Sequence, residues 1–169
     1  MRKDNRGLSL TEVMVVVAII AIVGAVGITS FNLLTGRPAQ QCSQQLMYSL
    51  ERHRTSAFGK VQSQYVLRVD SSTKAIVADE YLGNDDAMPK APSQTIEIGS
   101  SKVMVTYTDS NGKTYDLAKD PLTLQFNRST GAFKPTLPGA LHCTSITLKS
   151  GGREYTVNLV PLTGRIYID

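Results

Sequence analysis

The sequence predicts an α+β protein in which a long N-terminal helix is followed by a domain of short antiparallel strands. Three observations lead to this prediction. The chain carries no charged residue from Val13 to Gly36. Apolar residues then recur at helical spacing between Gln40 and Phe58. From Gln64 onward, short apolar segments alternate with turn-forming residues, which is the pattern of strands joined by hairpins.

The composition is that of a globular protein, with 41% apolar and 19% charged residues. The net charge is +4, of which the first seven residues supply +2, so the remainder carries 4 − 2 = +2. This excess is too small to indicate nucleic-acid binding by itself. The sequence lacks a zinc-protease motif, a nucleophile elbow and a phosphate-binding glycine loop. We therefore expect no enzyme, no cofactor and no metal site.

A basic segment precedes the apolar stretch. Arg2, Lys3 and Arg6 come before a run that starts at Val13 and has no clear signal-peptidase site. At 1.5 Å per residue, the uncharged run is long enough to cross the ~30 Å hydrocarbon core. We therefore predict a transmembrane first half of the helix. Basic residues favour the cytoplasmic side, which predicts a cytoplasmic N-terminus and an extracytoplasmic C-terminal domain.

Glu12 opens this apolar run. A carboxylate inside a membrane span costs about 2.5–3.5 kcal/mol and is a functional hypothesis by default. The residues around Glu12 read Gly-Leu-Ser-Leu-Thr-Glu-Val from Gly7 to Val13, and this segment resembles a prepilin leader site. The resemblance implies cleavage by prepilin peptidase between Gly7 and Leu8, followed by N-methylation of Leu8.

The resemblance also implies a domain organisation and a set of partners. Residues 1–7 would be a cleaved leader, 8–36 a hydrophobic transmembrane and assembly helix, and 37–169 an extracytoplasmic α+β pilin domain. Glu12 would meet the new amine of a neighbouring Leu8 and set the register of assembly, since a buried charge needs a partner. The partners would be prepilin peptidase, other pilin or pseudopilin subunits, an inner-membrane assembly platform, and membrane lipid before assembly.

The predicted second helical stretch, Gln40–Phe58, carries an apolar stripe that begins at Cys42 and includes Leu46 and Leu50. We expect the stripe to pack on the sheet, and Gly59 to end the helix. His53, on the same stretch, is expected to be exposed or only partly buried.

The rest of the chain predicts strands, with hairpin turns over 70–74, 109–112 and 150–153. The acidic residues Asp79, Glu80, Asp85 and Asp86 are expected to form a solvated stretch, because they lack the spacing of a calcium loop. The predicted strands are Gln64–Val69, Ala75–Asp79, Thr95–Ile98, Val103–Thr108, Leu122–Asn127, Ala132–Lys134, Ile146–Lys149, Tyr155–Val160 and Arg165–Ile168.

Two C-terminal segments resemble GspH/FimT-type minor pseudopilins. They are the strand and turn over Leu122–Gly131, and the strand, turn and Gly-Arg strand over Tyr155–Ile166. The resemblance implies a structural minor pilin or pseudopilin of a type IV pilus or a type II secretion pseudopilus.

The same resemblance implies an alternative function, DNA binding during uptake. Some FimT-like proteins are thought to use a basic Gly-Arg-x-Arg element, which here reads Gly-Arg-Ile-Tyr and has Tyr167 in place of the second arginine. The candidate DNA contacts are Lys149, Arg153, Arg165 and Tyr167. The other interpretation is that Arg165 simply begins an edge strand.

The two cysteines, Cys42 and Cys143, lie far apart and lack the spacing of a zinc site or a redox motif. Two alternatives remain open. Both residues are buried free thiols, or they form a disulfide that ties the helix to the sheet, which an extracytoplasmic location would permit.

Overall fold

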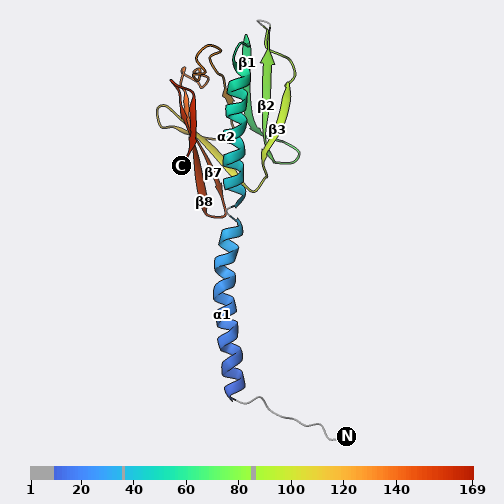
Figure 1. The fold of residues 1–169 in the computed structure, drawn as a ribbon, viewed down its shortest axis with the longest axis vertical. Helices are drawn as coiled ribbons and strands as arrows, with labels where there is room; N and C mark the ends of the chain where they lie inside the picture. The colour runs from blue at the N-terminus through green and yellow to red at the C-terminus, as the bar shows by residue number, and fades with distance from the viewer. Residues whose placement is uncertain (1–9, 36, 85–86) are drawn as a thin grey trace. The chain divides into compact units, whose positions relative to one another are not determined.

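The computed structural model describes residues 10–35, 37–84 and 87–169. Within these ranges the chain forms helices α1 and α2 and two antiparallel sheets, which confirms the α+β class, and Figure 1 shows how these elements follow one another along the chain. The chain divides into two compact units, one ending at Thr35 and the other spanning Gly36–Asp169. Each unit is described separately.

The first unit contains helix α1, Leu10–Thr35. Its sequence is apolar apart from a few small polar residues and Glu12 in the first turn. Within the part of the chain that the structure describes, no helix reaches both the length and the apolar character that membrane crossing needs. The transmembrane assignment therefore stays a prediction.

The second unit begins with helix α2, Arg37–Ala57. Pro38 lies in its first turn, where a proline costs no helical hydrogen bond, so the helix starts three residues earlier than predicted. Gly59 follows the helix with φ of 75°, the left-handed conformation that ends many helices. The predicted stripe is confirmed, because Cys42, Leu46 and Leu50 are all buried.

The strands form two antiparallel sheets, and α2 contacts strands of both. Figure 1 shows α2 running between β1–β3 on one side and β7–β8 on the other. The four-stranded sheet has the order β3-β2-β1-β6, from β3 (Gln94–Gly99), β2 (Ile76–Gly83), β1 (Gln62–Val69) and β6 (Leu122–Leu124). The five-stranded sheet has the order β5-β4-β7-β8-β9, from β5 (Thr114–Asp116), β4 (Met104–Asp109), β7 (Cys143–Ser150), β8 (Arg153–Val160) and β9 (Arg165–Ile168).

The predicted hairpin turns are confirmed. Gly151 and Gly152 both have positive φ, as a two-residue turn between β7 and β8 requires. Gly112, with φ of 84°, closes the turn between β4 and β5. The core fills the space between α2 and the inner faces of the sheets, and its largest buried side chains include Tyr65, Phe126, Leu46, Leu50, Leu67, Leu122, Ile146 and Leu148.

One strand is shorter than predicted. Residues Leu122–Asn127 were expected to be extended, but β6 ends at Leu124. Beyond it, Gln125 accepts a hydrogen bond from the backbone of Lys134, so the chain pairs locally with the following segment rather than with β1. The expected return strand over 132–134 is correspondingly reduced to a single bridge between Phe126 and Phe133.

Candidate functional sites

The predicted processing site lies at the start of the chain. Gly7 and Leu8 fall outside the described residues. Glu12 is exposed in the first turn of α1. A carboxylate at this end of a helix is favoured by the helix dipole.

The surface of α1 around Glu12 is apolar on every side. Over the residues whose side chains are described, Leu10 is 81%, Met14 68% and Ile22 66% exposed. Valines at consecutive positions leave no polar face. A helix that is apolar all round is normally buried in lipid or among other helices. This surface is therefore suited to a lipid environment or to helix–helix assembly.

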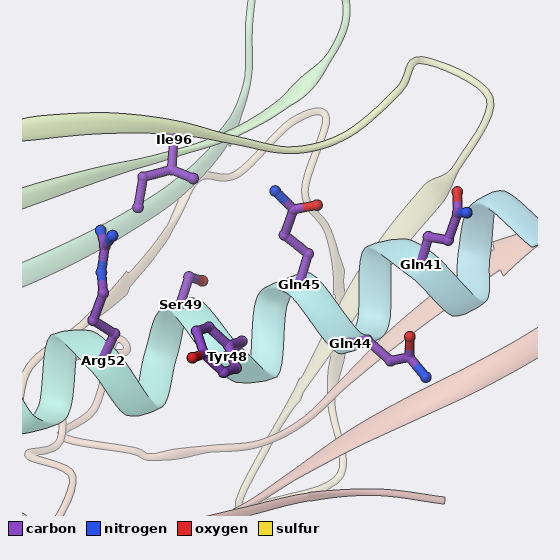
Figure 2. Close-up of a pocket in the computed structure, with 7 residues that line it drawn as sticks. All are labelled: Gln41, Gln44, Gln45, Tyr48, Ser49, Arg52 and Ile96. Atoms are coloured by element: carbon purple, nitrogen blue, oxygen red, sulfur yellow. The ribbon is translucent and has the colours of Figure 1, made fainter.

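A surface groove of about 640 Å³ runs along the outer face of α2 beside β3. Figure 2 shows Gln45 and Arg52 extending from α2 toward the strand that carries Ile96. Gln45 Nε2 donates a hydrogen bond of 2.9 Å to the carbonyl of Glu97 on β3. Most of the residues that line the groove carry polar groups, although their aliphatic and aromatic parts also face it: Gln41, Gln44, Gln45, Tyr48, Ser49 and Arg52, with Ile96.

Arg52, which lines this groove, also belongs to a buried polar cluster that corrects the expectation for His53. The His53 side chain is fully buried, with Nε2 3.0 Å from Ser63 Oγ and Nδ1 3.9 Å from Glu80 Oε2. The reason is position, because His53 lies three residues after Leu50 on the buried stripe of α2. Arg52 reaches both Glu80 carboxylate oxygens at 3.2 Å. Burial alone would raise the pKa of the Glu80 carboxyl, but the neighbouring His53 and Arg52 side chains hold the pKa below its usual value.

The expectation of a solvated acidic stretch is also wrong for Asp79 and Glu80, which are buried on β2. Asp79 accepts hydrogen bonds from Arg68 Nε at 2.7 Å and Thr95 Oγ1 at 2.6 Å. Cross-strand partners therefore compensate for the burial of these charges. Asp85 and Asp86 lie outside the described residues. Among the described residues, no cluster of His, Cys, Asp or Glu has the arrangement of a metal site.

Cys42 and Cys143 are both free and buried, so the structure contains no disulfide between them. Cys42 packs on β3, where a Cβ added to Gly99 would come 2.5 Å from its Sγ. Cys143 instead starts β7, and its Sγ donates to the carbonyl of Ser145 at 3.6 Å. Burial raises the pKa of each thiol to about 12. Both thiols therefore stay protonated and unreactive at neutral pH.

Comparison with known families bears on the N-terminal site. Residues 2–28 match the family model described as the prokaryotic N-terminal methylation motif. The chain carries the N-terminal motif of type IV pilin-like proteins. The matched range includes Gly7, Leu8 and Glu12, and this pilin motif implies processing by prepilin peptidase and assembly with other pilins. No curated protein and no solved structure matches this chain.

The candidate DNA contacts fall into two separate places. Lys149 and Arg153 lie at the β7–β8 hairpin, and Lys149 Nζ is 3.9 Å from Glu154 Oε2. Arg165 lies on β9, with its guanidinium 5.7 Å from the Tyr167 ring centroid. Lys149 pairs with Glu154 of β8 whereas Arg165 pairs with Val160. This places them about 20 Å apart along the strand.

The Gly-Arg element has a structural role that the sequence alone did not reveal. Gly164 has φ of 67°, and a Cβ added there would overlap the carbonyl oxygen of Gly131. Arg54 of α2 donates hydrogen bonds to the carbonyls of Gly131 and Thr163, at 3.1 and 3.0 Å. The two C-terminal segments that resemble minor pseudopilins therefore meet at this point, where they are tied to α2.

Proposed function

We propose that this pilin-like chain is a structural minor pilin or pseudopilin that is built into a type IV pilus or a type II secretion pseudopilus. The observation that carries the proposal is the methylation motif over residues 2–28, with Glu12 in the first turn of a helix that is apolar on every side. No chemistry is required of the subunit. Its task is to supply shape and register to a helical stack.

In this proposal, processing at Leu8 and assembly through Glu12 are linked by their spacing in the sequence. Cleavage after Gly7 would create an α-amino group on Leu8, which prepilin peptidase would then methylate. Glu12 lies four residues later in the sequence. In a stack of apolar helices, the Glu12 carboxylate of one subunit would pair with the Leu8 amine of a neighbour. A charge left unpaired in such surroundings is costly, so only the correct axial position is tolerated.

The proposed topology places the leader in the cytoplasm, residues 8–36 in the membrane before assembly, and residues 37–169 outside the cytoplasm. Arg2, Lys3 and Arg6 support it, because basic residues are retained on the cytoplasmic side. The subunit would then leave the lipid and enter a filament at an inner-membrane assembly platform. The apolar surface of α1 suits both environments.

Mass spectrometry of the full-length chain, extracted from membranes of a host with its prepilin peptidase, tests the proposal. We expect an N-terminal peptide that begins at Leu8 and carries one additional methyl group. The matched control is the same host without the peptidase, in which the chain should retain Met1–Gly7. A chain that keeps these residues in the presence of active peptidase would refute the pilin assignment.

DNA binding during uptake is the second candidate, and the observation in its favour is that Arg165 and Tyr167 lie together on β9. An arginine beside an aromatic ring can stack on an unpaired base. If the candidate is correct, Arg165→Glu combined with Arg153→Glu abolishes the gel shift that the full-length protein in micelles gives with DNA. A wild-type protein that produces no shift removes this candidate and leaves the structural proposal intact.

A further inference from the structure

A small cavity lies in the Gly36–Asp169 unit, where β4 and β5 meet the segments 120–123 and 136–138. Its volume is about 260 Å³. Most small-molecule pockets measure about 300–1,000 Å³, so this one suits a single side chain better than a metabolite. Its walls include two tyrosine rings, three apolar residues and one carboxylate: Tyr107, Tyr115, Pro121, Leu137, Pro138 and Asp120.

The two tyrosines form a rigid aromatic wall. Tyr107 on β4 is directly opposite Tyr115 on β5, and the rings stack with centroids 5.2 Å apart and planes 12° apart. The Tyr115 hydroxyl donates a hydrogen bond of 3.1 Å to Asp109 Oδ2. Lys113 Nζ lies 4.8 Å from the Tyr115 ring centroid. Since ring faces attract cations, this pair already holds one cation.

Two polar groups of the cavity are unused. Tyr107 is only 3% exposed as a whole residue, but its hydroxyl is not among the buried polar atoms without a partner in the described residues, so this oxygen is open to the cavity that Tyr107 lines. Burial, and then the negative charge of Asp120, raise the pKa of Tyr107 to about 12, so the phenol remains a neutral donor and acceptor. The Asp120 carboxylate has no hydrogen bond or ion pair within the described ranges. Both groups line the cavity and are reached by solvent, so a ligand that enters the cavity can take the place of water as their hydrogen-bonding partner.

We propose that this cavity binds an arginine side chain presented by another protein chain. A guanidinium group is planar and stacks on aromatic rings, and its fork of N–H donors suits both a carboxylate and a phenol oxygen. The aliphatic part of the arginine side chain would pack against Pro121, Leu137 and Pro138. An anionic group would be repelled by Asp120, and a purely apolar group would leave both polar groups unpaired.

The test is a titration of the full-length protein in detergent micelles with N-acetyl-L-arginine amide, followed through the ring signals of ¹³C-labelled tyrosines. We expect saturable shifts for Tyr107 and Tyr115, and none for Tyr48 on α2. The corresponding citrulline amide has nearly the same shape but no charge, so it should bind about five-fold more weakly or worse. Equal affinity for the two compounds, or the absence of saturable shifts, would overturn the proposal.

Two conservative variants assign the binding to this cavity. Asp120→Asn removes the charge of an exposed side chain, and Tyr107→Phe removes only a hydroxyl, so neither should prevent folding. Each should weaken binding of the arginine amide about five-fold or more. The matched control is Asp116→Asn, because Asp116 is an exposed carboxylate near the cavity that does not line it. If Asp116→Asn weakens binding as much as Asp120→Asn does, the effect is general electrostatics and the proposed site is wrong.

Discussion

Gly164 has no side chain, and this absence brings two distant segments together. Its backbone adopts a positive φ and lies against the carbonyl of Gly131, which also accepts a hydrogen bond from Arg54. Any other residue would be strained by the left-handed backbone, and its Cβ would also overlap the carbonyl oxygen of Gly131. The conformation and the contact together account for a glycine before Arg165, without any role in DNA binding.

We predict that Gly164→Ala lowers the free energy of unfolding of the second unit by at least about 2–3 kcal/mol. The measurement is urea unfolding of the full-length protein in micelles, followed by tyrosine near-ultraviolet circular dichroism. All seven tyrosines lie after Gly36, so this signal reports on the second unit.

Gly152→Ala is the matched control. Gly152 also has a positive φ, of 78°, but a Cβ added there meets nothing within 4 Å. This variant should therefore show only the cost of the left-handed backbone, about 1–2 kcal/mol. If Gly164→Ala and Gly152→Ala lower the free energy of unfolding by the same amount, the overlap with Gly131 does not contribute to stability.

The elements α2 and β2 are joined by a buried carboxylate. Glu80 of β2 meets Arg52 and His53 of α2, and its pKa in the folded protein lies below the usual value of 4.5. The unfolded chain therefore takes up this proton first as the pH falls. The ionised Glu80 carboxylate therefore stabilises the folded state fully above about pH 4.5, and this stabilisation is lost as the pH drops toward the pKa of Glu80 in the folded protein.

We predict that Glu80→Gln makes acid unfolding less steep. The variant has no carboxylate to protonate, so its free energy of unfolding should be lower than that of the wild type at pH 7, by about 1–2 kcal/mol, and should approach it below pH 4. Urea unfolding of the wild type and the variant at a series of pH values measures the difference at pH 7 and its decrease below pH 4. Glu51→Gln, on the exposed side of α2, is the control. Its free energy of unfolding should depend on pH in the same way as that of the wild type. A Glu80→Gln curve parallel to the wild type at all pH values would rule out this coupling.

The sequence predicted those elements whose signals are local. The turns at 109–112 and 150–153 contain the glycines that positive φ requires, and α2 shows the apolar period of a helix. The N-terminal methylation motif is also a pattern of residues close together in the sequence, so the sequence alone is enough to predict it. The burial of His53 was readable from the same period, although it was not expected. The pairing of Glu80 with Arg52, and the cavity at Tyr107, depend on strand order and register, which no local pattern specifies.

For the whole molecule, the proposed function makes Glu12 decisive for assembly but not for folding. We predict that Glu12→Val leaves the amount of processed protein in the membrane unchanged and reduces the amount in sheared filaments by about ten-fold or more. Immunoblots of the two fractions measure this. A valine continues the apolar run, so membrane retention should not suffer.

Glu12→Gln separates charge from size in the same experiment. It keeps the shape of the side chain but removes the carboxylate that would pair with a neighbouring Leu8 amine. It should therefore assemble as poorly as Glu12→Val. Normal filament levels in Glu12→Gln would show that Glu12 acts without its charge, and the proposed register mechanism would then be wrong.

The strand order also has a consequence for the time course of folding. The β7-β8-β9 meander joins neighbours in sequence, whereas β6 pairs with β1 across more than fifty residues. Nearby segments meet faster than distant ones, so the meander should form early and the contact between Gly131 and Gly164 late. Gly164 lies in the turn between β8 and β9, where its backbone N–H donates to the carbonyl of Val160, so its left-handed strain acts on the early meander and its overlap with Gly131 acts on the later contact. Gly164→Ala should therefore both slow refolding and accelerate unfolding, which stopped-flow kinetics in urea would show as a shift of both limbs.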